Sequence, residues 1–414
     1  MGRVLFRDLR LLDARAAALR EGMEVLVDRA TIAEVGPAPL DAGGAEVIDL
    51  GGRTLMPGLI DAHVHVTAVS VDLGALQRMP VSLITAKAGR ILEEMLLRGF
   101  TTVRDAGGAD HGLAEAVRLG LFKGPRLLVS GRAMSQTGGH GDFRPQVDVP
   151  VDPCGCAHVH GGIGRIADGV PEVRRAARDE IRLGARQIKI MASGGVASPA
   201  DPIHFTQYAM EELRALVEEA EAADTYAFAH AYTPKAIRRA IAAGCRSIEH
   251  GNLLDEPTAR LMAERRVFLV PTLATYHALA RHGRELGFPE VSLEKLHDVV
   301  EAGTGALRIA KAAGVRMVYG TDLLGDLHRY QLSEFRLRGE VLSPAEMIQS
   351  ATVVAAELMN MDGEIGVIEP GACADLLVVD GDPLTAGVDL LAELDRHIAL
   401  IMKDGVFVRN SLTG

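Results

Sequence analysis

Apolar and polar positions follow two patterns along the chain, and the longer pattern occupies its middle. From residue 56 to about residue 358, short apolar segments are separated by longer amphipathic stretches, which predicts repeated strand–helix units around a parallel sheet. We expect eight strands, at 59–66, 101–105, 126–130, 187–191, 226–230, 246–250, 268–271 and 316–320. We expect helices between them, including 171–183, 210–223, 234–243 and 292–313. Eight alternations indicate an α/β fold with a (β/α)8 TIM barrel.

Both ends of the chain instead show short strand patterns separated by turn residues. The first segment predicts strands at 3–12, 24–27, 31–35 and 46–50, and the last predicts strands at 374–380 and 398–408. We therefore predict a small β-sandwich domain built jointly from residues 1–55 and 362–414. The barrel domain is expected to comprise residues 56–361.

One connecting segment, residues 134–169, is longer than an ordinary loop between a strand and a helix, and such loops usually carry a function or are disordered. It contains Cys154 and Cys156, followed by His158 and His160. Ligands at every second residue cannot surround a metal as a Cys-X-X-Cys turn does. We interpret these residues as part of the loop structure, with a disulfide or an additional metal as the alternative.

The composition is that of a folded protein and argues against several classes of partner. Of 414 residues, 48% are hydrophobic and 24% are charged, and 44 Lys and Arg against 55 Asp and Glu give a net charge of -11. This acidic balance disfavours nucleic acid as a partner. The sequence shows no apolar segment of the ~18 residues that a membrane span needs, no signal-peptide pattern and too few cysteines for a disulfide framework. We expect a cytoplasmic protein that binds neither nucleic acid nor membrane.

Polar residues stand at the ends of several predicted strands, where a barrel places its active site. His63 and His65 end the first strand on the same face, His230 and His250 end the fifth and sixth, and Asp322 follows the eighth. A single histidine in a strand is more often a hydrogen-bonded core residue than a ligand. Four histidines and a carboxylate that converge on one face of one fold indicate a metal site instead.

A lysine in the predicted strand 187–191 adds to this interpretation. Ile188 and Ile190 are expected to face the helices, so Lys189 points into the barrel interior. Burial near cations lowers the pKa of a lysine and favours the neutral amine, which can react with carbon dioxide to give a carbamate. A carbamate is an anionic ligand that can bridge two metals. The alternative is a lysine paired with an acidic residue, although its own strand contains none.

Together, these motifs resemble those of the amidohydrolase superfamily. The stretch Pro-Gly-Leu-Ile-Asp-Ala-His-Val-His at 57–65, the strand lysine, the two later histidines and Gly-Thr-Asp at 320–322 occur in the family's order, and the resemblance covers essentially the whole chain. The sequence is most similar to the imidazolonepropionase-like branch, on the stretches 187–196, 230–233 and 248–252. That branch contains Xaa-Pro dipeptidases, or prolidases, and ochratoxin-degrading amidohydrolases.

The resemblance implies a binuclear zinc centre, bridged by the carboxylated lysine and a hydroxide. The implied ligands are His63, His65, Asp322 and the carbamate of Lys189 for the more buried ion, and the same carbamate, His230 and His250 for the other. Zinc lowers the pKa of bound water from 15.7 to about 7, so a nucleophile forms near neutral pH. Asp322 is expected to accept the proton of that nucleophile and to pass it to the leaving amine.

Two further side chains are candidate substrate contacts. His140 follows two glycines that let the backbone approach a ligand closely, and Tyr232 lies two residues after His230. We expect His140 and Tyr232 to bind the oxyanion of the reaction or a free carboxylate of the substrate. The alternative is a histidine that stabilises its loop and a tyrosine that only packs.

The function that follows is hydrolysis of the amide bond of a dipeptide or an N-acyl amino acid with a free carboxylate, as in an Xaa-Pro dipeptidase. The alternatives are an amidase for N-acyl aromatic amino acids such as ochratoxin A, which would release phenylalanine, a cyclic amide or imidazolone hydrolase, and an inactive barrel acting as a scaffold. The expected partner is a small-molecule substrate. Relatives suggest a homo-oligomer, with an octamer as one form.

Overall fold

The computed structural model describes residues 2–144, 162–198 and 201–412. The chain divides into two compact units. One comprises Met1–Asp61, Glu93–Val103 and Leu332–Gly414, and the other comprises Ala62–Leu92 and Arg104–Gln331. Among helices of the described residues, none is both long enough and apolar enough to cross a membrane.

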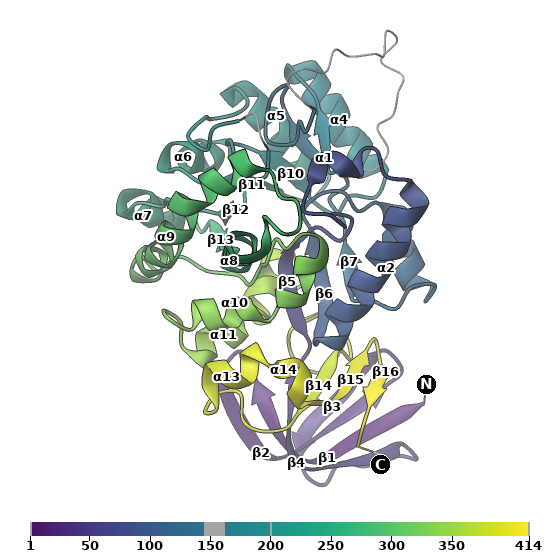
Figure 1. Ribbon diagram of the computed structural model, residues 1–414. Helices are drawn as coiled ribbons and strands as arrows, with labels where there is room; N and C mark the ends of the chain where they lie inside the picture. The colour runs from purple at the N-terminus through teal and green to yellow at the C-terminus, as the bar shows by residue number, and fades with distance from the viewer. Residues whose placement is uncertain (1, 145–161, 199–200, 413–414) are drawn as a thin grey trace. The chain divides into compact units, whose positions relative to one another are not determined.

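The first unit is built on one seven-stranded sheet that both ends of the chain enter (Figure 1). Its order is β16-β15-β14-β4-β1-β2-β3, and β1 and β4 are the parallel pair in it. The strands are β1 (Arg3–Asp13), β2 (Ala18–Asp28), β3 (Thr31–Pro37), β4 (Glu46–Pro57), β14 (Leu376–Val379), β15 (Ile398–Lys403) and β16 (Val406–Asn410). Apolar side chains of β1, β2, β4, β14 and β15 form one buried cluster, which holds the two ends of the chain together.

The predicted single strand at 398–408 is wrong, because the structure divides it into β15 and β16. The turn between them is Asp404-Gly405, a pair that favours tight hairpins because both residues tolerate a positive φ. A Cβ at Gly405 would lie 1.6 Å from the carbonyl oxygen of Arg29, so this turn requires glycine. Before β15, the structure also forms two short helices that the pattern did not predict, α13 (Gly387–Ala392) and α14 (Leu394–His397).

The second unit contains a parallel sheet of six strands, in the order β13-β12-β11-β10-β8-β9. Its strands are β8 (Ala133–Ser135), β9 (Gly164–Ile166), β10 (Ile188–Met191), β11 (Ala227–Ala231), β12 (Ser247–His250) and β13 (Phe268–Val270). Helices α4 (Val170–Arg182), α5 (Met210–Glu221), α6 (Pro234–Ala243) and α7 (Glu256–Glu264) lie outside these strands (Figure 1). The apolar faces of the helices and the outward side chains of the strands form a continuous core.

Three more predicted strands form a separate sheet in the order β5 (Leu59–Val64), β6 (Phe100–Asp105) and β7 (Arg126–Leu128). The eighth prediction, 316–320, forms a single parallel bridge, between Leu269 and Met317. Its next residues reach β5, because the amide of Ala62 donates to the carbonyl of Tyr319 at 2.8 Å. The described residues therefore form a mixed α/β fold with parallel strands, in which the regular ladder is not closed.

The sequence pattern predicted a long loop over residues 134–169, but the structure places a strand at each end of this segment. Strands β8 and β9 lie at its two ends and pair with each other, and β8 also pairs with β10. A three-residue strand is too short to show a period of two, so the sequence pattern missed both. Cys154 and Cys156 lie outside the described residues.

Candidate metal centre

All eight predicted site residues line one buried cavity of about 40 Å³. They come from different strands or from the loops that follow them: His63, His65, His140, Lys189, His230, Tyr232, His250 and Asp322. Because parallel strands end at the same edge of a sheet, residues far apart in sequence meet there.

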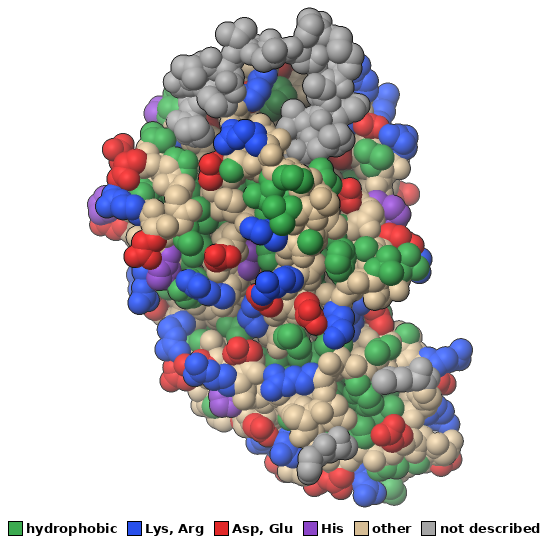
Figure 2. Space-filling view, turned by 45° about the vertical axis from the view of Figure 1, so that its right-hand side comes forward, with side chains coloured by type: hydrophobic (Ala, Val, Ile, Leu, Met, Phe, Trp, Pro, Cys, Tyr) green, Lys and Arg blue, Asp and Glu red, His purple; other side chains and the backbone are tan. Residues whose placement is uncertain are grey.

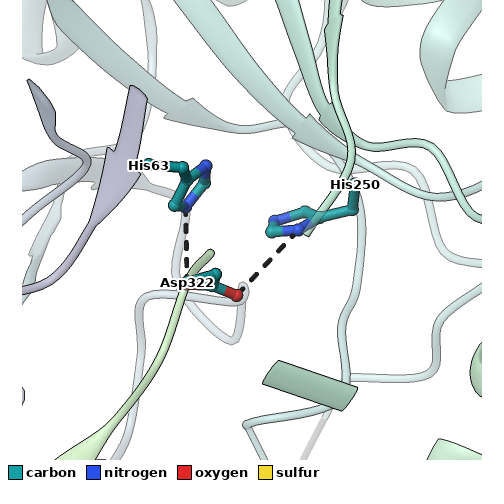
Figure 3. A group of neighbouring side chains, drawn as sticks. All are labelled: His63, His250 and Asp322. Atoms are coloured by element: carbon teal, nitrogen blue, oxygen red, sulfur yellow. Dashed lines mark ion pairs between the residues drawn. The ribbon is translucent and has the colours of Figure 1, made fainter. Parts of the chain in front are cut away.

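Asp322 stands at the centre of the histidines. Its Oδ1 lies 3.4 Å from Nε2 of His63 and 3.2 Å from Nε2 of His65, and its Oδ2 lies 3.9 Å from Nδ1 of His250. Figure 3 shows His63 and His250 pointing toward this carboxylate from two sides. One ligand atom from each of these three side chains lies within 4.8 Å of the others, which is the convergence that a metal site needs.

The backbone at Asp322 is held in an uncommon conformation. Its φ is +55°, in the left-handed region that non-glycine residues rarely adopt, and its amide donates to the carbonyl of His63 at 2.8 Å. Burial by itself would raise the pKa of the Asp322 carboxyl, but the imidazoles of His63 and His65 hold that pKa well below its ordinary value. The carboxylate is therefore ionised at neutral pH, as both a metal ligand and a proton acceptor must be.

Each of the four histidines uses one ring nitrogen for an outer partner. The contacts are His63 Nδ1 with Glu249 Oε2 at 2.6 Å, His65 Nδ1 with the Gly107 carbonyl at 2.8 Å, His230 Nε2 with the Gly194 carbonyl at 3.2 Å, and His250 Nδ1 with Thr272 Oγ1 at 2.8 Å. Such partners fix the ring and leave its other nitrogen for a metal. Burial, the largest cause, also lowers the pKa of His230 and His250 well below the ordinary value, which favours the neutral, ligating form. The donor set thus fits a metal centre.

A fully buried ion pair lies behind His63 and was not predicted. Both carboxylate oxygens of Glu249 accept from Nη2 of Arg104, at 3.0 and 2.9 Å, and both side chains are fully buried. Burial would raise the pKa of Glu249, but the Arg104 guanidinium holds it well below the ordinary value. Arg104 also lies over the ring of Phe228, 4.1 Å from its centroid. There was little sign of this role for Glu249 in the sequence. It precedes His250 in the same strand, so alternation points its side chain away from His250, and the structure shows that it contacts Nδ1 of His63 instead.

Lys189 is buried in the same cavity, with its Nζ 5.2 Å from the centroid of Phe228. Burial lowers its pKa from 10.5 to about 8, against the opposing effect of Glu249 and Asp322. A substantial part of this amine is therefore neutral in mildly alkaline solution, and the neutral amine is the form that reacts with carbon dioxide.

Replacing Lys189 by methionine should stabilise the metal-free protein. A pKa lowered from 10.5 to about 8 means that burying the charged lysine lowers the free energy of unfolding at pH 7 by about 3 kcal/mol. Lys189→Met removes this cost. The difference should decline between pH 8 and 10.5, because in that window the folded protein has already released the proton and the unfolded chain has not. Urea unfolding with a chelator at several pH values measures it. A pH-independent difference for Lys189→Met would contradict the expectation.

A pair of tyrosine hydroxyls faces the cavity beside His250. The Tyr232 and Tyr276 oxygens lie 2.7 Å apart, and the Tyr232 ring stacks on His250 with a centroid distance of 5.3 Å. Burial raises the pKa of both phenols, so both remain protonated. Because one hydroxyl donates to the other, the pair retains one O–H for a ligand. Tyr276 was missed because it lies in the helix α8 (Leu273–His282) rather than at a strand end.

His140 lies against His230, with their rings stacked 4.2 Å apart, and its Nδ1 contacts Oδ2 of Asp201 at 3.2 Å. The structure thus brings both candidate substrate contacts to the cavity. Asp105, the last residue of β6, lies outside the lining and accepts hydrogen bonds from the amides of Val66, Gly107 and Ala109.

A larger hollow of about 910 Å³ lies elsewhere in the second unit, lined by parts of α2 (Val81–Leu97), α3 (His111–Arg118) and α4. Charged groups in its wall pair with each other, as Arg165 does with Asp179 and Glu180 at 2.8 and 2.9 Å. It contains none of the convergent donors, so the chemistry belongs to the smaller cavity.

Comparison with known proteins agrees with the motifs. The pattern of the amidohydrolase family matches residues 54–408. One solved amidohydrolase structure is 52% identical with a TM-score of 0.96, covering 99% of both chains. A prolidase solved in complex with N-methylphosphonate-L-proline is 50% identical with a TM-score of 0.96, covering 99% of this chain and 100% of that one. The ochratoxinase of Aspergillus niger is 34% identical over 342 residues, which are 80% of this chain and 71% of that protein. The resemblance predicted from the sequence is confirmed, and the chain belongs to the amidohydrolase family.

Proposed function

We propose that this protein is a binuclear zinc amide hydrolase, built on a (β/α)8 barrel of residues 56–361 with a β-sandwich formed by 1–55 and 362–414. The observation that carries the proposal is the convergence of His63, His250 and Asp322, whose ligand atoms lie within 4.8 Å of one another. The outer partner of each site histidine supports the same conclusion, because it fixes the ring in an orientation in which the other nitrogen can ligate a metal.

The donor set supports two zinc ions that share one lysine. His63, His65 and Asp322 would hold one ion, His230 and His250 the other, and Lys189, carboxylated on Nζ, would bridge them. When bound, zinc would lower the pKa of a water and polarise an amide carbonyl. The lowered pKa of Lys189, about 8, supports the carboxylation.

The chain's own residues would orient the substrate and move one proton. Ionised Asp322 would accept the proton of the attacking water and then deliver it to the nitrogen of the leaving amine, acting first as base and then as acid. The hydroxyl that the Tyr232–Tyr276 pair retains would donate to an oxygen of the substrate. With its Nδ1 proton given to Asp201, His140 would accept at Nε2, so it would contact a donor of the substrate such as the amine of a dipeptide, rather than the oxyanion or carboxylate expected from the sequence.

The substrate that we propose first is a dipeptide or an N-acyl amino acid with a free carboxylate, as for an Xaa-Pro dipeptidase. The 50% identity to a prolidase that binds a proline phosphonate supports this choice. The 34% identity to an ochratoxinase supports a second candidate, an amidase for N-acyl aromatic amino acids such as ochratoxin A. The apolar part of the lining suits either acyl group, and it consists of Leu73, Phe143, Ile163, Met191, Val196, Ala197, Leu279 and Leu324.

Charge on the surface agrees with a small-molecule partner. On the face that Figure 2 shows, lysine and arginine side chains are interspersed with aspartate and glutamate, rather than gathered as a phosphate-binding surface requires. We also propose a homo-oligomer, and light scattering of the purified protein would measure its size.

A substrate panel tests the proposed function. The zinc-loaded protein, prepared with bicarbonate, is assayed on Xaa-Pro dipeptides, N-acyl-proline, N-acyl-phenylalanine, ochratoxin A and an imidazolone, each acyl amino acid also as its carboxamide. We expect turnover of the substrates with a free carboxylate, and a kcat/KM at least tenfold lower for the matching carboxamides. A higher kcat/KM for substrates that release proline would favour the dipeptidase, and a higher kcat/KM for those that release phenylalanine would favour the amidase. Turnover of the imidazolone alone, or of none of the panel, would reject the substrate assignment.

Tyr232→Phe should lower kcat/KM by about 10- to 150-fold on the best substrate, because the loss of one hydrogen bond to a charged group is worth about 1.5–3 kcal/mol. The matched variant Tyr208→Phe, at a buried tyrosine outside the cavity lining, should change kcat/KM less than twofold. An unchanged kcat/KM in Tyr232→Phe would remove this hydroxyl from substrate binding.

A further inference from the structure

The ring of His140 is held in place from several sides. Its backbone amide donates to Oε1 of Gln207 at 2.9 Å, and its ring stacks on His230 at a centroid distance of 4.2 Å. The ring also packs against the backbone of Gly195 so closely that a Cβ there would lie 2.2 Å from its Cε1. The contacts fix the plane of the ring but do not determine which nitrogen carries the proton.

Asp201 determines that nitrogen. This aspartate is 2% exposed, and its Oδ2 accepts from Nδ1 of His140 at 3.2 Å, from the amide of Gly195 at 3.1 Å and from Nε2 of Gln207 at 3.1 Å. Oδ2 of Asp201 already accepts hydrogen bonds from the Gly195 amide and from Nε2 of Gln207, so it has no proton to donate to the imidazole. Nδ1 of His140 must therefore carry the proton of their contact. Nε2 is then the ring nitrogen available to a ligand in the cavity.

Lys295 holds the loop that carries Asp201. It lies on α9 (Glu290–Ala312), about a hundred residues later, and its Nζ donates to the carbonyls of Gly195, Ser198 and Asp201 at 3.0, 2.8 and 2.7 Å. The same Nζ lies 4.0 Å from Oδ1 of Asp201. Three carbonyls and a carboxylate around one ammonium satisfy all its donors, so the loop and its carboxylate are tied to the helix.

We propose that Asp201 and Lys295 are positioning residues, Asp201 fixing the tautomer of His140 and Lys295 holding the loop that brings Asp201 to it. The assignment deepens the proposed function and rests on it, since His140 acts on the substrate of that reaction. Neither residue contacts the ligand itself. Their effect on turnover passes through His140.

A double-mutant cycle tests this path. Asp201→Asn should lower kcat/KM about 10- to 100-fold, the usual loss when the partner of a functional histidine is removed. In a His140→Ala background, the same change should lower kcat/KM less than twofold, because the residue it positions is gone. Lys295→Met should also lower kcat/KM in the natural protein and change it little in the His140→Ala background. Lys295→Arg keeps the positive charge and should retain most of the natural kcat/KM. The control Lys311→Met, on the same helix, should leave kcat/KM unchanged. Independent losses that add in the double variant would overturn the proposal.

A spectroscopic measurement decides the assignment without a substrate. Histidine-selective ¹⁵N spectra, with the His140 signals identified by their absence in His140→Ala, should show the Nδ1-protonated tautomer in the natural protein and a gain of the Nε2-protonated tautomer in Asp201→Asn. The Nε2-protonated tautomer in the natural protein would overturn the proposal. If the substrate panel shows no turnover, the proposed function fails while this measurement still decides what Asp201 does.

Discussion

Asp322→Asn should lower kcat by ~10²- to 10⁴-fold, the usual contribution of a positioned acid–base group, while the protein still folds and keeps most of its zinc. Asparagine keeps the shape of the side chain and an oxygen able to ligate, but it cannot accept a proton. The pKa of Asp322 lies well below the ordinary value, so the natural side chain is ionised at neutral pH and the substitution removes a real base.

Zinc content, circular dichroism and kcat measured on the same preparation separate the two roles of this residue. Asp326→Asn, at an exposed position four residues later, is the matched control and should change kcat less than twofold. A kcat that falls only in proportion to the zinc lost would make Asp322 a ligand and not a base. Full activity would remove it from the mechanism.

Glu249→Gln should have the second largest effect, on stability and zinc affinity together. The change leaves the Arg104 guanidinium fully buried without its counter-charge, which costs about 3–5 kcal/mol of unfolding free energy. It also removes the charged partner of Nδ1 of His63, and loss of such a partner lowers metal affinity about 10- to 100-fold. Urea unfolding of the metal-free protein and zinc competition with a chelator measure the two effects separately.

The chain offers a matched control in a second buried ion pair. Glu334 and Arg338 are also fully buried, with a contact of 2.7 Å, and neither lines the cavity. Glu334→Gln should therefore lower stability to a similar extent and leave zinc affinity unchanged. Equal zinc affinities for Glu249→Gln and the natural protein would show that the pair serves the fold alone.

The sequence predicted the alternation of strands and helices because each element buries one face, so its apolar residues recur with the period of a strand or of a helix. Helix 234–243 was predicted at its exact bounds, since Thr233, a helix-capping residue, and Pro234 mark its start and Gly244 its end. The predicted strand 398–408 failed because it ran across the local turn signal Asp404-Gly405. Strands β8 and β9 were missed because three residues are too few to show a period of two. The domain limits at 55 and 362 and the zinc ligand set remain predictions.

The sequence by itself determined which strand ends carry chemistry, because alternation in a strand places His63 and His65 on one face and a single buried lysine must face the interior. It could not reveal Glu249, Arg104, Tyr276, Asp201 or Lys295, whose partners at the site lie between 44 and 186 residues away. Only the tertiary structure brings these side chains to the histidines. Hydrogen bonds between side chains depend on distances that chain folding sets, and they leave no periodic signal in the sequence.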